Sequence, residues 1–142
     1  DKILAIMQSG TYCTYSSQSL ITHFDDDMTI IQKYQPETIV TAIYFNQKEE
    51  QYFVKRFNIT TAEKKTLFID KDAGDQLHLV TTAENPKIQI NFANKNKKTH
   101  PDTQLETNEL IDVKGIKAKG KKISKYDVKK IILIEENISK EN

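Results

Sequence analysis

A strand-turn-strand pattern that recurs along the chain restricts the fold more than any other feature of the sequence. Each copy joins two short apolar runs through a polar or glycine-containing link, as in a β-hairpin. The predicted hairpins pair residues 3–7 with 11–15, 42–45 with 52–57, and 77–81 with 87–92. They begin at residues 3, 42 and 77, at intervals of 39 and 35 residues, which is typical of one repeated unit in a propeller-like fold.

The remaining segments favour the same fold class. Residues 88–92 alternate apolar and polar side chains, as does a strand with one buried face, and 131–134 predict a last strand. No window of twelve or more residues keeps a helical apolar period, although 61–67 could form a short helical turn. Residues 94–108 are polar and contain Pro101, which predicts a surface loop. We therefore expect an all-β protein.

Length and composition bound the organisation of the chain. Its 142 residues, of which 37% are hydrophobic, suit one domain, 1–142, with a buried core. The chain starts at Asp1 rather than methionine, so we expect a fragment of a longer subunit. Its single cysteine, Cys13, cannot form an internal disulfide, and no apolar run is long enough to span a membrane. A cytoplasmic location is expected.

Charge is distributed unevenly, although 21 basic and 20 acidic residues nearly cancel. Residues 114–130 contain eight lysines and one acid, Asp127, a net charge of +7 that would attract a polyanion such as nucleic acid. The alternative is an ordinary solvated lysine surface. Apolar side chains are interleaved with these lysines, which indicates that the segment packs on a core: Val113, Ile116, Ile123, Tyr126 and Val128.

Motifs for catalysis or metal binding are incomplete. Residues 115–122 approach the phosphate-binding pattern GxxxxGK[ST], but Lys122 replaces the hydroxyl residue and a strand is predicted to follow. Residues 70–75 resemble the start of a calcium loop whose glycine comes one position early. The histidines lack ligand spacing to one another or to Cys13. We therefore assign no catalytic residue, no metal ligand and no cofactor to this chain.

The second predicted hairpin carries Lys55 beside Arg56, the one arginine of the sequence. On position alone, these cations could be edge-strand charges that discourage sheet-to-sheet aggregation.

Residues 52–60, 111–124 and 125–135 together resemble the C-terminal domain of a bacterial type IIA DNA topoisomerase A subunit, of the topoisomerase IV or gyrase group. The resemblance covers nearly the whole chain. It implies a β-pinwheel, a propeller variant whose blades exchange strands and whose basic rim bends DNA. About three blades fit in this chain, against five or six in well-known relatives, so we expect a truncated or an open partial pinwheel.

The resemblance also implies which residues face DNA. Lys55 and Arg56 match basic positions of blade hairpins, and 114–122 match the glycine- and arginine-rich wrapping box of gyrase, here without its arginines, which favours topoisomerase IV behaviour. No tyrosine matches the nucleophile of the family, because Arg56 is followed by Phe57. The expected nucleic-acid-binding residues are Lys55, Arg56, Lys114, Lys117, Lys119, Lys121, Lys122 and Lys125.

The function expected from this resemblance is non-catalytic binding and bending of double-stranded DNA for an ATP-dependent topoisomerase, an isomerase. ATP and Mg²⁺ would be held by other domains or subunits of the parent, whose A-subunit dimer and ATPase B subunit are the expected protein partners. The location would be cytoplasmic, at the nucleoid. The competing hypothesis is a propeller-like protein-interaction module whose acidic first half, with Asp25, Asp26, Asp27, Glu49 and Glu50, meets a protein partner.

Overall fold

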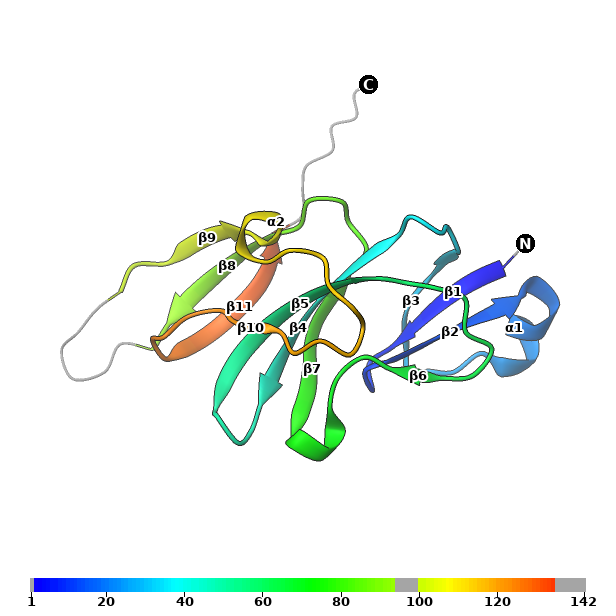
Figure 1. Ribbon diagram of the computed structural model, residues 1–142, viewed down its shortest axis with the longest axis horizontal. Helices are drawn as coiled ribbons and strands as arrows, with labels where there is room; N and C mark the ends of the chain where they lie inside the picture. The colour runs from blue at the N-terminus through cyan, green and yellow to red at the C-terminus, as the bar shows by residue number, and fades with distance from the viewer. Residues whose placement is uncertain (1, 94–99, 135–142) are drawn as a thin grey trace, which may run out of the picture.

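The computed structural model describes residues 2–93 and 100–134. It is 50% strand and 11% helix, with three antiparallel sheets that do not close into a barrel (Figure 1). The prediction of an all-β fold is confirmed.

Sheet 1 contains β1 (Lys2–Met7), β2 (Thr11–Ser16), β3 (Met28–Lys33) and β6 (Thr66–Leu67), in the order β3-β1-β2-β6. Helix α1 (Ser17–His23) connects β2 to β3, and the Ser16 side chain accepts a hydrogen bond from the Ser19 backbone N–H at its start. Gly10 has φ of +92° in the β1–β2 turn, and a Cβ there would lie 2.5 Å from the Ile69 side chain. Glycine therefore satisfies both the turn and the packing.

Sheet 2 contains β4 (Ile39–Asn46), β5 (Gln51–Asn58), β7 (Asp75–Thr81) and β10 (Lys121–Lys122), in the order β10-β5-β4-β7. A short 3₁₀ helix, η1 (Lys71–Ala73), precedes β7. Sheet 3 contains β8 (Lys87–Phe92), β9 (Thr103–Glu106) and β11 (Val128–Ile134), in the order β11-β8-β9. Helix α2 (Thr107–Leu110) follows β9 directly.

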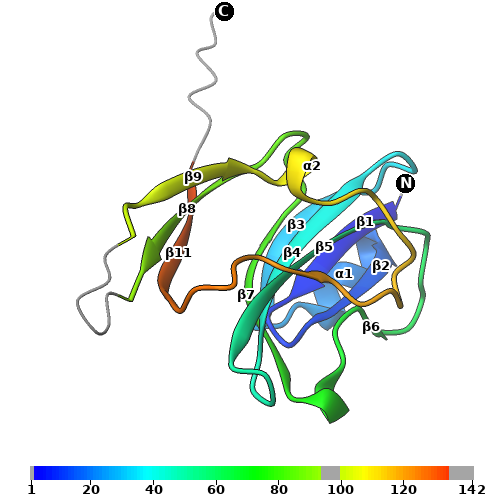
Figure 2. The same ribbon diagram turned by 60° about the vertical axis from the view of Figure 1, so that its left-hand side comes forward.

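Two segments cross from one sheet to the sheet before it and return. We call residues 59–74 the first arm, because they leave β5 of sheet 2, add β6 to sheet 1 and return to sheet 2 as β7. The second arm, residues 107–127, leaves β9 of sheet 3, adds β10 to sheet 2 and returns as β11 (Figure 2). Neighbouring sheets therefore exchange a short strand.

Sheet 2 lies between the other two sheets, and this position explains its composition. One apolar cluster joins sheet 1 to sheet 2 through residues such as Leu4, Tyr44 and Phe57, and another joins sheet 2 to sheet 3 through residues such as Val54 and Ile90. Successive side chains of a strand point to opposite faces, so β4 and β5 need apolar residues on both. Their nearly continuous buried runs follow from this.

Comparison with the expected elements gives a mixed result. The hairpins β1–β2 and β4–β5 and the last strand, β11, are confirmed. The third predicted hairpin is wrong, since β7 pairs with β4 whereas β8 pairs with β9 and β11. The helical turn at 61–67 is also wrong, because this segment ends in β6. The predicted loop 94–108 contains β9 and the start of α2, and residues 94–99 lie outside the described residues.

Candidate nucleic-acid interface

Lys55 lies in the middle of β5 and is only 6% exposed. Its Nζ donates hydrogen bonds to the carbonyl oxygens of Phe68, at 2.7 Å, and Ile116, at 2.6 Å. Phe68 belongs to the first arm and Ile116 to the second, so one ammonium group holds both arms against sheet 2. Burial lowers the pKa of Lys55, and attraction to Asp75 opposes this shift.

Arg56 follows Lys55 in the strand and therefore points to the opposite face of sheet 2, toward sheet 3. It is 9% exposed, and its Nη1 donates a hydrogen bond to the carbonyl oxygen of Ile111 in the second arm, at 3.2 Å. Burial lowers the pKa of Arg56, whereas the negative charge of Asp112 raises it. Its Nε is buried without a hydrogen-bond partner among the described residues.

These positions differ from our expectation that Lys55 and Arg56 lie on a DNA-facing surface. The physical reason is that both faces of sheet 2 are covered around Lys55 and Arg56, so neither orientation of a side chain in this part of β5 reaches solvent. An ammonium or guanidinium group that is buried and hydrogen-bonded to backbone carbonyls cannot contact the phosphates of DNA. Both residues anchor the arms, and we leave them out of the candidate interface.

The other expected lysines all lie in the second arm, and all are exposed. They are Lys114, Lys117, Lys119, Lys121, Lys122 and Lys125. The arm itself is held against the core, because Ile111 and Ile123 are buried in the cluster between sheets 2 and 3. The predicted packing of interleaved apolar residues is thus confirmed for Ile116, Ile123 and Val128, which pack in or against the core clusters. It is wrong for Val113 and Tyr126, which remain exposed.

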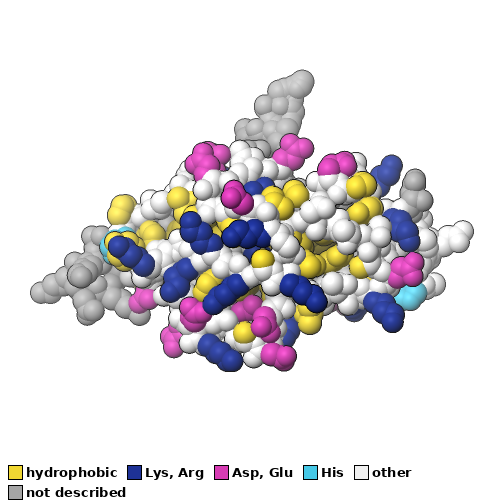
Figure 3. Space-filling view, viewed as in Figure 1, with side chains coloured by type: hydrophobic (Ala, Val, Ile, Leu, Met, Phe, Trp, Pro, Cys, Tyr) yellow, Lys and Arg dark blue, Asp and Glu magenta, His cyan; other side chains and the backbone are white. Residues whose placement is uncertain are grey.

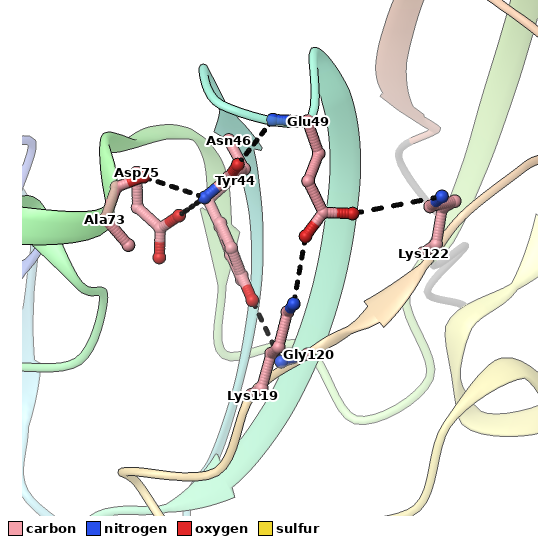
Figure 4. A network of polar contacts seen from close by, with 8 residues as sticks. All are labelled: Tyr44, Asn46, Glu49, Ala73, Asp75, Lys119, Gly120 and Lys122. Carbon is pink, nitrogen blue, oxygen red and sulfur yellow. Dashed lines mark hydrogen bonds and ion pairs between the residues drawn. The ribbon is translucent and has the colours of Figure 1, made fainter.

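Gly120 brings the second arm close to sheet 2. A Cβ at this position would lie 2.6 Å from the Val54 carbonyl oxygen, so a larger residue would push the arm away. The Gly120 backbone N–H donates a hydrogen bond to the Tyr44 hydroxyl oxygen at 2.9 Å (Figure 4). Burial raises the pKa of this hydroxyl, which remains protonated at neutral pH. The lysines on either side of Gly120 are therefore attached to a backbone that is held against sheet 2.

One acidic residue contacts this lysine group. Glu49, in the turn between β4 and β5, lies 3.0 Å from Lys119 Nζ through Oε2 and 3.9 Å from Lys122 Nζ through Oε1 (Figure 4). The hydrogen bond from Lys119 lowers the pKa of Glu49, so the carboxylate stays charged at neutral pH. Exposed ion pairs of this kind are weak and exchange readily with other anions.

The exposed lysines form a group on one face of the molecule. Figure 3 shows basic side chains gathered over β10 and the strands beside it, with acidic side chains mostly around this group. Within residues 114–125 the charge is +6, from six lysines and no acid. A concentrated positive field over a fixed arm can bind a polyanion even though the whole chain carries only +1.

Other chemistry finds little support in the described part of the chain. No group of three or more His, Cys, Asp or Glu side chains there could hold a metal ion. Residues 115–122 end in β10 and do not open a helix, as a phosphate-binding loop would require. No helix among the described residues has the length and hydrophobicity needed to span a bilayer.

Comparison with known protein families shows to which family this chain belongs. The family model described as the topoisomerase C-terminal domain of Bacteroidota matches residues 1–136. The chain belongs to this family. No curated protein and no solved structure matches it. The family expected from residues 52–60 and 111–135 is thus confirmed as a bacterial topoisomerase C-terminal domain.

Two features of this topoisomerase C-terminal domain were missed by sequence reasoning. Glu49 is distant in sequence from Lys119, and only the exchange of β10 into sheet 2 brings them together. Lys64 and Lys65 lie in the first arm, where an expected helical turn concealed their relation to Lys121 and Lys122. An alignment of the two arms on their paired lysines would have provided a signal.

Proposed function

We propose that this topoisomerase C-terminal domain is a non-catalytic module that binds and bends double-stranded DNA for a type IIA parent enzyme. The observation that carries the proposal is the group of six exposed lysines on the second arm, with no acid between residues 114 and 125. Lysine ammonium groups bind phosphates as point charges and release condensed counterions from the duplex. Such contacts read the backbone, not the bases.

The exchange of short strands between neighbouring sheets favours bending of DNA over simple attachment to DNA. In this proposal the three sheets are the blades of a partial β-pinwheel, and an arm that crosses each junction between sheets makes it rigid. A rigid curved surface recovers the few kcal/mol needed to bend a short duplex by adding phosphate contacts along the curve. We place the contacts on the side of the molecule where β10 lies.

The parent enzyme would supply the chemistry. In this proposal an A-subunit dimer of the gyrase or topoisomerase IV group cuts DNA with a tyrosine in another domain, and an ATPase B subunit binds ATP and Mg²⁺. The chain described here would hold the duplex near that core, in the cytoplasm at the nucleoid. Its lysines position DNA and take no part in breaking a bond.

The salt dependence of DNA binding tests this proposal. Each phosphate contact contributes about −0.9 to the slope of log affinity against log salt concentration, so six contacts predict a slope of about −5. The slope is measured by fluorescence anisotropy with a labelled linear duplex. A bending surface should also prefer a minicircle to a linear duplex of the same sequence. A flat salt dependence would refute phosphate binding, and equal affinity for both DNA forms would refute bending.

Charge-reversal substitutions test whether the second arm is the DNA-binding surface. Replacing Lys119, Lys121 and Lys122 with glutamate should abolish most binding to every duplex sequence. A control with the same charge change uses Lys2, Lys33 and Lys129, which are exposed but lie on three strands outside the second arm. Equal losses from both triple variants would mean that net charge, and not the arm, controls affinity.

One observation favours the second candidate, a protein-interaction module. Ile21 on α1 is 81% exposed and Phe24 just after it is 63% exposed, beside the acidic residues 25–27. Exposed large apolar side chains next to charges are typical of a protein-binding surface. If the chain fails to bind duplex DNA at low salt, this end of the molecule becomes the better candidate site.

A further inference from the structure

The two arms occupy equivalent places in a structural repeat. In each case a hairpin is followed by an arm, and the arm is followed by a strand that returns to the hairpin: β4–β5, first arm, β7, and then β8–β9, second arm, β11. Each arm adds its short strand to the second hairpin strand of the preceding sheet, β2 or β5. Each returning strand pairs with the first strand of its own hairpin.

Strand pairing gives the residue-by-residue equivalence of the arms. In the first arm, Thr66 lies opposite Tyr12, the second residue of β2. In the second arm, the Ile123 backbone N–H donates a 3.0 Å hydrogen bond to the carbonyl of Tyr52, the second residue of β5. Thr66 and Ile123 are therefore equivalent positions, measured from the start of the strand to which each arm is added.

The equivalence extends to the residues just before these positions. Lys64 and Lys65 precede Thr66, and Lys121 and Lys122 precede Ile123. All four lysines are exposed. The repeat thus places a pair of consecutive lysines close to the exchanged strand at both junctions between sheets, just before β6 in the first arm and within β10 in the second, and Figure 1 shows both arms on the side nearest the viewer.

The two lysine pairs also share an electrostatic arrangement. In each pair the second lysine lies near an acid in a connection next to the sheet that accepts the arm. Lys65 Nζ is 3.6 Å from Asp25, which lies between α1 and β3, and Lys122 Nζ is 3.9 Å from Glu49, which lies in the β4–β5 turn. Both ion pairs are exposed, so a phosphate can replace the carboxylate at small cost. Glu63 precedes the first pair, whereas no acid lies between residues 114 and 125, so the first arm is the weaker site.

We propose that Lys64 and Lys65 form a second phosphate-binding site, used together with Lys121 and Lys122 by one duplex that crosses both arms. This inference rests on the proposed DNA-binding function and adds a site on the first arm. The duplex backbone presents phosphates at regular intervals, so a repeated lysine pair can engage it twice. Two fixed contacts, one at each junction between sheets, would set the path of the bound DNA.

The test removes the charges of the first arm from the full chain. Lys64→Gln with Lys65→Gln should lower the magnitude of the salt slope by up to about 2, because two phosphate contacts are lost. Affinity near 0.1 M salt should fall about ten-fold, less than two full contacts would give, because Glu63 and Asp25 already offset part of the charge. Anisotropy titrations with one labelled linear duplex across a salt series measure both quantities.

A matched control comes from β11. Lys129 and Lys130 are also consecutive and exposed but lie outside both arms, so Lys129→Gln with Lys130→Gln should leave the slope unchanged. Lys64→Arg with Lys65→Arg should retain affinity, which separates loss of charge from loss of structure. If wild type binds and the first-arm glutamine variant binds equally well, the second site is refuted alone. If the wild-type protein does not bind the duplex, both the second site and the proposed function are refuted.

Discussion

The cations of β5 and those of the second arm have opposite environments, although the sequence presents both as basic clusters among apolar residues. Lys55 and Arg56 are buried and donate to backbone carbonyls of the arms. Lysines such as Lys117 and Lys121 are exposed on an arm that is itself held by those bonds. The hydrogen bonds of Lys55 and Arg56 hold the second arm in place, and that arm carries the exposed lysines.

The difference shows that the position of a strand within its sheet decides the role of its charges. A cation in the middle of β5 has no solvent-facing orientation, because both faces of sheet 2 are covered there, whereas β10 is the edge strand of the same sheet and its lysines are exposed. A buried ammonium persists there only because carbonyl oxygens replace its water. Substitutions should therefore separate stability, which we expect β5 to control, from the proposed DNA affinity, which we expect the arms to control.

The largest expected effect is on stability. Lys55→Met keeps the apolar stem but removes two hydrogen bonds and leaves two carbonyl oxygens unpaired, so the free energy of unfolding should fall by about 3 kcal/mol. Urea unfolding followed by circular dichroism measures the change. The matched exposed variant, Lys117→Met, should alter it by less than about 0.5 kcal/mol. Equal effects of the two variants would contradict the distinction between buried and displayed lysines.

A smaller effect is expected on DNA affinity. Glu49→Gln removes the carboxylate that contacts Lys119 and Lys122, so affinity for duplex DNA should rise by about three-fold at low salt, with little change in stability. Glu50→Gln in the same turn is the control, since Glu50 forms no ion pair with the described lysines of the second arm. Similar gains from both variants would show a general charge effect in place of release of these lysines.

The smallest effect is a pH dependence of stability. Because burial lowers the pKa of Lys55 in the folded state from its ordinary value of 10.5, the unfolded chain binds this proton more tightly. Stability from this group should therefore rise with pH between the lowered pKa and 10.5. The measurement compares wild type with Lys55→Met from about pH 8 to about pH 10. Parallel pH profiles of the two proteins would show that the Lys55 pKa is the same in both states.

Local features of the sequence predicted the local part of the fold. The turn at Gly10 and the apolar runs of β4 and β5 identified two hairpins, because such pairings join neighbouring segments. The third predicted hairpin failed for the same reason: β7 and β8 are adjacent in sequence, but β7 completes sheet 2 and β8 begins sheet 3. Nothing in their apolar patterns distinguishes these partners.

The candidate site was predictable only in part. The density of lysines in residues 114–125 identified an exposed basic segment, because a charge of +6 cannot be buried. The burial of Lys55 and Arg56 could not be read in the same way, since it depends on Phe68, Ile116 and Ile111 arriving from distant arms. The two-residue strands β6 and β10 are too short to give a periodic signal.

The crossing arms have a consequence for how the chain folds as it is synthesised. Sheet 1 lacks its last strand until Leu67 has left the ribosome, and sheet 2 lacks its last strand until Lys122 has done so. Each of these two sheets is therefore completed only by an arm that comes later in the sequence. Early and late segments of the chain should then fold in one cooperative transition. A nascent chain that stops before Leu67 would expose the edge of β2 to pairing with a neighbouring polypeptide, and one that stops between Leu67 and Lys122 would expose the edge of β5.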